Sequence, residues 1–257
     1  MKDSLRQAAV VLAVLGTLVV NVLANALPLN GLSTGEISDR FRVYFVPAGY
    51  VFSIWGLIYV GLIAYAIFQA LPAQRENPRL RAVGWWVVLS GLANSAWIFL
   101  WHYEQFSVTL FAMLLLLATL LVTYLRLGIG RTATSLAESW AVRVPFSIYL
   151  GWITVATVAN VTQLLDYLNW NAFGIAPEVW TGIVLAAVLV IAVLMNFTRR
   201  DAAYTLVILW ALAGIAIKHA AVAAVATPTW VVFGLVLVTL AGALLFRRAP
   251  RPAQAGM

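Results

Sequence analysis

The stretch from Phe45 to Phe68 carries no charge and contains three aromatic residues at spacings of three and four: Phe52, Trp55 and Tyr59. Side chains three and four positions apart lie on one face of a helix, so these rings form one aromatic surface. Such a surface can pack against neighbouring helices, or it can stack on a flat ligand. The spacing by itself leaves both interpretations open.

Two further groups combine aromatic rings with amides. Asn94 and Trp97 are three residues apart, and Trp152, Ala156 and Asn160 follow one another at spacings of four. An aromatic pocket with few polar groups suits a flat, mostly apolar ligand that is held by shape and stacking more than by charge. The structural alternative is that the tryptophans fill crevices between helices, while each asparagine forms an interhelical hydrogen bond for about 1 kcal/mol.

The elements that must position these residues are membrane helices. Of the 257 residues 63% are hydrophobic, and the mean hydropathy of +0.95 is far above that of a soluble domain. Eight apolar spans are predicted, at residues 8–27, 45–68, 84–101, 107–125, 142–165, 179–197, 202–222 and 230–246. Each is long enough to cross a bilayer. The predicted fold class is all-α, a polytopic membrane bundle of about eight transmembrane helices.

The basic residues predict the orientation of the spans, because Lys and Arg gather on the cytoplasmic side. Of the 16 Lys and Arg residues, only Arg40, Arg42 and Lys218 fall on the side opposite the termini. We therefore expect a protein of the cell membrane with both termini in the cytoplasm. Nucleic acid is not an expected partner, since the charges lie in short clusters between spans rather than on one face.

The sequence contains no recognisable catalytic arrangement. It lacks a Ser-His-Asp set, a metal-ligand set and a phosphate-binding glycine loop. The turn from His102 to Glu104 offers too few ligands for zinc, and we expect it to be a solvated cap. Lys218 is expected to extend toward the membrane interface. We predict no catalytic residues, no metal and no required cofactor, so an enzyme is the less supported class.

Three blocks of the sequence, in the same order, resemble a known family. The pattern P-x-x-x-V-F-x-x-W-x-x-x-Y, which ends at Tyr59, resembles the second-helix signature of the tryptophan-rich sensory protein family, also called TspO or translocator protein (peripheral benzodiazepine receptor-like). N-S-A-W, from Asn94 to Trp97, resembles its third-helix block. Y-x-x-W-x-x-x-A-x-x-x-N, which ends at Asn160, resembles its fifth-helix block. Ala48 and Ile148 stand where the family carries prolines.

The resemblance covers roughly residues 10–170 and implies a five-helix bundle for residues 1–170. Residues 171–257 would add three transmembrane helices and a basic cytoplasmic tail. The resemblance implies a first helix near the N-terminus, although Lys2, Arg6 and the Ala24-Asn25-Ala26 sequence also fit a cleaved signal peptide. In the family, the loop that corresponds to residues 27–44 covers the ligand pocket. The last three spans lack faces that combine aromatic rings with amides, so we expect them to pack outside without lining the pocket.

The resemblance also implies a set of pocket residues and a ligand class. The residues that match the family's blocks are Phe52, Trp55, Tyr59, Asn94, Trp97, Trp152, Ala156 and Asn160. The implied ligand is a porphyrin or another tetrapyrrole, and the implied role is that of a sensor or regulator. A transporter of such a molecule and a photo-oxidative porphyrin-degrading enzyme remain alternatives. The expected partners are the lipid bilayer and a small hydrophobic ligand, with a homodimer left open.

Overall fold

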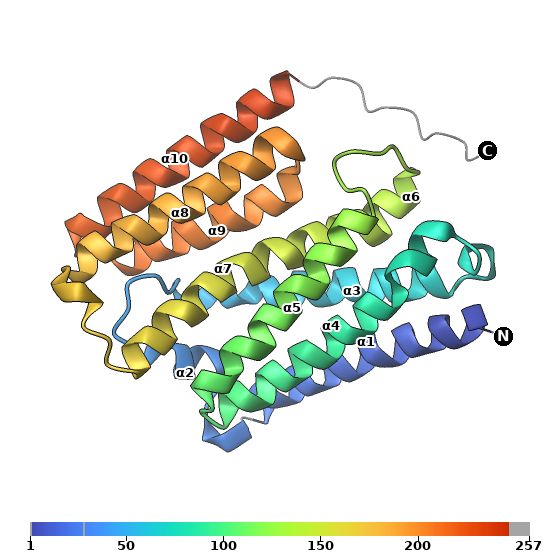
Figure 1. Ribbon diagram of the computed structural model, residues 1–257, viewed down its shortest axis with the longest axis horizontal. Helices are drawn as coiled ribbons and strands as arrows, with labels where there is room; N and C mark the ends of the chain where they lie inside the picture. Colours follow the sequence, from blue (N-terminus) through green and yellow to red (C-terminus); the bar gives the residue numbers. More distant parts are fainter. Residues whose placement is uncertain (1, 28, 247–257) are drawn as a thin grey trace.

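The computed structural model describes residues 2–27 and 29–246, and this part of the chain forms a bundle of helices (Figure 1). Its α-helices are α1 (Lys2–Ala26), α2 (Thr34–Asp39), α3 (Ile54–Ala70), α4 (Pro78–His102), α5 (Phe106–Arg126), α6 (Leu136–Glu138), α7 (Val144–Tyr167), α8 (Pro177–Thr198), α9 (Ala202–Lys218) and α10 (Ala223–Leu245). The prediction of an all-α polytopic fold is confirmed.

Seven helical segments of the described chain are long and apolar enough to cross a membrane. They include every long α-helix except α9, which is apolar but has only 17 residues. At about 1.5 Å per residue α9 is roughly 25 Å long, at the lower limit for a transmembrane helix. The predicted span 202–222 is therefore too long, because the helix ends at Lys218.

Helix ends are fixed by residues that satisfy free backbone groups. Pro78 opens α4, where a missing N–H costs nothing, and the Asn77 side chain accepts a hydrogen bond from the Arg79 N–H. At α9 the side chain of Asp201 accepts a bond from the Tyr204 N–H at 3.2 Å. Such caps matter at a membrane surface, because uncapped backbone groups near hydrocarbon have no water to bind.

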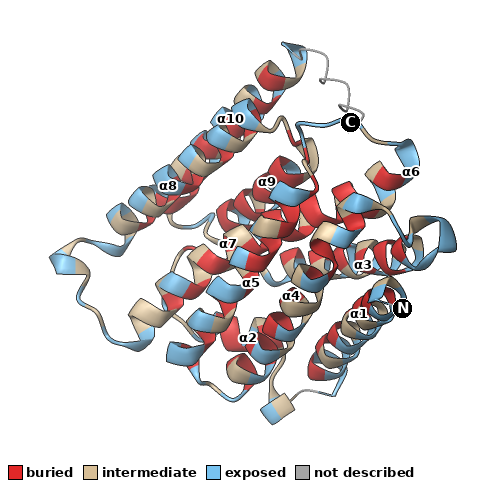
Figure 2. Ribbon diagram, turned by 45° about the vertical axis from the view of Figure 1, so that its right-hand side comes forward, coloured by how far each residue is buried: buried red, intermediate tan, exposed pale blue. Residues whose placement is uncertain are grey.

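Five long helices form a closed ring. Around the ring, α1 packs on α4, α4 on α5, α5 on α7, and α3 lies between α7 and α1. Buried residues, red in Figure 2, gather on the faces that these helices turn toward one another. Pro145 of α7 approaches α3 so closely that a Cβ on Gly61 would lie 2.9 Å from the Pro145 Cβ.

The last three helices form a second group beside the ring. α10 packs on both α8 and α9, and α9 packs on α7 (Figure 1). The α7–α9 contact is close, since a Cβ on Gly151 would lie 2.9 Å from the Tyr204 carbonyl oxygen. A contact this tight tolerates only glycine, as is common between membrane helices.

Other predicted boundaries also differ from the structure, since α1 begins at Lys2 and α4 at Pro78, before the predicted spans 8–27 and 84–101. The span 45–68 begins too early, because Ala48 is extended and the chain becomes helical only at a 3-10 turn, Gly49–Ser53. The Ala48 N–H donates to the Gly214 carbonyl of α9 at 3.3 Å, so this segment is held as an arm across α9. The span 230–246 begins too late, because α10 starts at Ala223 and contains Pro228.

The described chain begins and ends at the same end of the bundle, here named the terminal end (Figure 1). The opposite end, where α2 lies, is named the loop end. This arrangement is the one that an even number of crossings produces. Which end faces the cytoplasm stays a prediction from the basic residues, and the basic tail at 247–257 lies outside the described residues.

Candidate ligand-binding site

A short helix roofs the ring at the loop end. In α2, the Ser33 hydroxyl accepts from the Glu36 N–H and the Glu36 carboxylate accepts from the Ser33 N–H, which forms a capping box. This bonding lowers the pKa of Glu36, first through the Ser33 side chain and then through its backbone. The Trp101 Nε1–H donates to the Thr34 carbonyl at 3.2 Å, which ties the roof to α4.

His102 also holds the roof in place. It is fully buried, and its ring nitrogens lie 3.1 Å from the Thr34 hydroxyl and 3.1 Å from the Leu29 carbonyl oxygen. The expectation that residues 102–104 form a solvated cap is therefore wrong for His102. Its neighbour Glu104 is partly exposed and pairs with Arg40 of the loop. Sequence pattern could not separate the two, because the burial of His102 depends on a loop 70 residues away in the chain.

Beneath this roof lies a cavity of about 40 Å³ lined by residues of α2, α3, α4, α5 and α7, which we name the aromatic cavity. Six of the eight predicted site residues line it: Phe52, Trp55, Trp97, Trp152, Ala156 and Asn160. Trp101, Pro47 and Gln163, which were not predicted, line it as well. Trp101 stacks on Trp97, with centroids 5.5 Å apart and planes at 17°, one helical turn further along α4.

The tryptophans of α3 and α7 touch one another instead of forming opposite walls. The ring centroids of Trp55 and Trp152 are 6.3 Å apart at an interplanar angle of 80°. Phe52 meets Trp152 in the same edge-to-face manner at 5.7 Å. Trp97 and Trp101, stacked on α4, form a separate part of the lining. Two aromatic clusters therefore enclose the cavity, one on α4 and one between α3 and α7.

The polar groups of the aromatic cavity are few and uncharged. Gln163 Nε2 donates to the Ser38 hydroxyl at 2.8 Å, and Trp97 Nε1 lies 3.5 Å from Asn160 Oδ1. The Nε1–H of Trp152 is buried and has no hydrogen-bond partner in the described part of the chain. An unpaired buried donor is costly, so this group favours a ligand that presents an acceptor atom.

Asn94 does not line the aromatic cavity. It is fully buried; its Oδ1 accepts from Asn21 at 2.6 Å and its Nδ2 donates to the Tyr149 hydroxyl at 2.9 Å. These bonds join α1, α4 and α7 and use the amide for packing. Asn21 was missed by the sequence analysis, although a lone asparagine in an apolar span was a signal that an interhelical partner exists.

Tyr59 lies on another opening, which we name the side groove. This groove of about 410 Å³ runs between α1 and α3, and its lining includes Val22, Asn25 and Tyr59. Thr34, Phe52 and Trp55 line both the side groove and the aromatic cavity. Trp55 stacks on Tyr59 with centroids 5.7 Å apart, so its indole forms part of the partition between the two spaces.

Metal chemistry finds no support in the described residues, which contain no group of three His, Cys, Asp or Glu side chains able to hold an ion. The arrangement instead provides an uncharged aromatic site, with the buried unpaired Nε1–H of Trp152 among its lining residues, next to a larger groove.

A family model described as TSPO-like protein matches residues 7–242 of the chain. The match extends over α8, α9 and most of α10, beyond the residues 10–170 that carry the resemblance in the sequence. Neither the curated proteins nor the solved structures gave a match.

Proposed function

The chain belongs to the TSPO-like family of membrane proteins, and from this premise we propose that it binds a flat hydrophobic ligand of the tetrapyrrole class as a sensor or regulator. The observation that supports this proposal is the shared lining of the aromatic cavity and the side groove. Trp55 belongs to this shared lining, and four tryptophans from three helices line the aromatic cavity under a hydrogen-bonded roof. One of them, Trp152, has a buried indole N–H with no acceptor in the described part of the chain.

The aromatic cavity alone is too small to hold a tetrapyrrole. A cavity of about 40 Å³ has room for roughly one water molecule, while sites for drug-sized ligands span about 300–1,000 Å³. The side groove, at about 410 Å³, is of the right size. A tetrapyrrole would therefore occupy the groove and reach the aromatic cavity by displacing the Trp55 ring, which separates the two spaces.

The roof explains how such a site would be closed to water. Arg40 pairs with Glu104, and Lys218 of α9 pairs with Asp39 of α2 at 2.6 Å. Trp210 of α9 donates from Nε1 to the Val51 carbonyl at 3.1 Å, next to Phe52. Helix α9 would thus support the roof and the start of α3, although it does not line the aromatic cavity.

A porphyrin titration tests the proposal. Protein in nanodiscs should shift and saturate the porphyrin absorbance band at one ligand per chain. The emission of the cavity tryptophans should be quenched in parallel, because energy transfer requires that the ligand lie close to them. Absence of a saturable spectral change would refute tetrapyrrole binding.

A further inference from the structure

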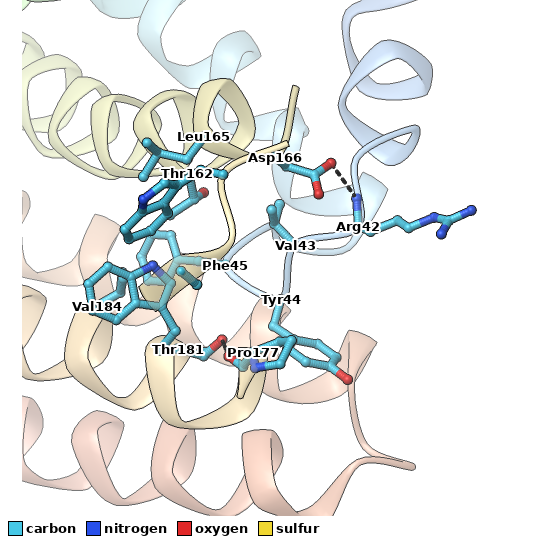
Figure 3. A pocket seen from close by; sticks show the side chains of 13 residues that line it. Arg42, Val43, Tyr44, Phe45, Thr162, Leu165, Asp166, Pro177, Thr181 and Val184 are labelled. Carbon is cyan, nitrogen blue, oxygen red and sulfur yellow. Dashed lines mark hydrogen bonds between the residues drawn. The ribbon is translucent and has the colours of Figure 1, made fainter. Parts of the chain in front are cut away.

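A third space, in addition to the aromatic cavity and the side groove, lies at the loop end between the ring and the outer helices. This loop-end pocket has a volume of about 130 Å³, and its lining includes Tyr44 and Phe45 of the loop, Asp166 at the end of α7, Trp170, and Trp180 of α8 (Figure 3). None of its lining residues lines the aromatic cavity or the side groove. It is therefore a separate site.

Aromatic rings dominate the wall of the loop-end pocket. The centroids of Trp170 and Trp180 are 5.1 Å apart with planes at 57°, so the two indoles form a corner rather than a flat stack. Tyr44 and Phe45 approach from the loop. Several tilted rings around a small space attract a cation, because the face of each ring carries negative charge and that of Trp the most.

One carboxylate, Asp166, lines this pocket, and a second, Glu178, is bonded to the lining residue Tyr44; neither has a basic side chain as a partner. Asp166 Oδ2 accepts from the Arg42 backbone N–H at 3.1 Å, and Glu178 accepts from the Tyr44 hydroxyl at 3.0 Å. The bond to Glu178 raises the pKa of Tyr44, so its hydroxyl stays protonated. Across the described chain, no side-chain nitrogen of Lys, Arg or His lies within 4.0 Å of either carboxylate. The Arg42 side chain extends away from the pocket (Figure 3).

The other carboxylates at this end are already satisfied. Asp39 pairs with Lys218, Glu104 pairs with Arg40, and Glu36 closes the capping box of α2. The loop-end pocket is thus the place at this end of the bundle where unpaired negative charge and aromatic rings coincide. An anion placed there would be repelled by Asp166 in the wall and by Glu178 behind Tyr44, whereas a cation would contact Asp166 and the aromatic rings.

We propose that the loop-end pocket binds a substituted ammonium group, with Trp170 and Trp180 as ring faces and Asp166 as the counter-charge. The volume of about 130 Å³ corresponds to roughly four water molecules, enough for a head group but not for a drug-sized ligand. The remainder of the molecule would stay outside. The ammonium group can belong to a lipid head group at the membrane surface or to a free amine.

Choline is a suitable probe, and its neutral carbon isostere is the matched control because it has the same shape without the charge. Nanodiscs made only of phosphatidylglycerol keep competing amine lipids out, and saturation-transfer NMR follows weak binding. Choline should bind saturably and at least tenfold more tightly than the isostere. Equal binding of the two, or no saturable binding of choline, would overturn the proposal.

Variants connect this binding to the named residues. Asp166→Asn keeps an oxygen for the Arg42 N–H but removes the charge, so it should abolish the preference for choline over the isostere. The double variant W170L/W180L should weaken choline binding at least tenfold, while W230L, which removes an exposed tryptophan on α10, should leave it unchanged. Wild-type binding in the double variant, or an equal loss in W230L, would contradict the assignment.

A second experiment, in nanodiscs of a different lipid composition, tests whether a lipid or a free amine supplies the ammonium group. In discs that contain phosphatidylethanolamine, a lipid ligand would compete and weaken choline binding several-fold. Unchanged choline affinity there would assign the pocket to free amines. Either result is compatible with an ammonium site and identifies what supplies it.

Discussion

The indole rings of Trp55 and Trp152 meet edge to face, with centroids 6.3 Å apart, and both line the aromatic cavity. Trp55 belongs to α3 and Trp152 to α7, two neighbouring helices of the bundle. The contact therefore joins two walls of the proposed site, and it also makes each ring depend on the other for its position.

Replacing either Trp55 or Trp152 with Ala should weaken porphyrin binding at least tenfold. The variant loses an aromatic contact worth about 0.5–1.5 kcal/mol and the burial of a large ring, and about 1.4 kcal/mol corresponds to one decade of affinity. Trp140→Ala and Trp230→Ala are the controls, since both rings are exposed and lie outside the cavity. They should stay within about twofold in the same fluorescence-quenching titration. Equal losses at all four positions would indicate general destabilisation instead.

The two predicted asparagines should behave differently. Asn94→Ala breaks the bonds to Asn21 and Tyr149 and should lower the free energy of unfolding by about 1–2 kcal/mol, with porphyrin affinity within about twofold. Asn160→Ala changes the lining of the aromatic cavity and should mainly lower affinity. Thermal unfolding and porphyrin titration of both variants separate the two roles. A large loss of porphyrin affinity in the Asn94 variant, with unchanged stability, would show that Asn94 contributes to binding.

Gly214 of α9 should influence the site although it does not line it. A Cβ at this position would lie 2.2 Å from Val51 Cγ2, so Gly214→Ala must displace the turn that carries Phe52. We expect porphyrin binding to weaken several-fold, and the double variant G214A/V51A to recover most of the loss because the clash disappears. Gly234→Ala, with open space around its Cβ, is the control. A double variant as weak as G214A alone would show that the effect is not steric.

Both ends of the chain should lie in the cytoplasm. A reporter that is active only outside the cytoplasm should be silent when it is fused after Met257, and active when the chain is cut and fused after Gly174 in the connection between α7 and α8. This expectation rests on the distribution of Lys and Arg and on the position of both described ends of the chain at the same end of the bundle. Activity after Met257 would mean an odd number of crossings.

His219 should make stability depend on pH. Burial first, and then the charge of Lys218, lower the pKa of His219 below its ordinary 6.5. The folded state therefore resists protonation, so the stability contribution is complete above pH 6.5 and is lost as the pH falls toward the lowered value. The melting temperature in detergent should drop between pH 7.5 and 5, and His219→Gln should reduce the drop. An identical pH profile in the variant would exclude His219 as the cause.

Much of this fold could be read from the sequence, because a bilayer leaves an apolar segment little choice but to form a helix. The family resemblance grouped Phe52, Trp55, Trp97, Trp152, Ala156 and Asn160, and these six residues line one cavity in the structure. What could not be read depends on partners distant in the chain. The role of Asn94 is set by Asn21, 73 residues away, and the start of α3 is set by the contact of Ala48 with Gly214.

The loop-end pocket shows the same limit. In the sequence alone, an aromatic residue such as Trp170 at the end of a span is typical of an interfacial belt at a membrane surface. Only the fold brings Tyr44 and Asp166 to the same place, from segments more than 100 residues apart. Asp39 pairs with Lys218, whereas Asp166 forms no ion pair in the described chain. The sequence alone does not indicate which of these carboxylates forms a salt bridge.

The side groove between α1 and α3 has a consequence for how affinity should be measured. We expect a space of about 410 Å³ on the flank of a membrane bundle to be filled by hydrocarbon, either an acyl chain or a detergent tail. Ligand uptake is then an exchange, in which the incoming molecule displaces a resident lipid chain. The apparent dissociation constant becomes a ratio of two affinities, and it will vary with chain length and unsaturation of the surrounding lipid even when every protein contact is the same.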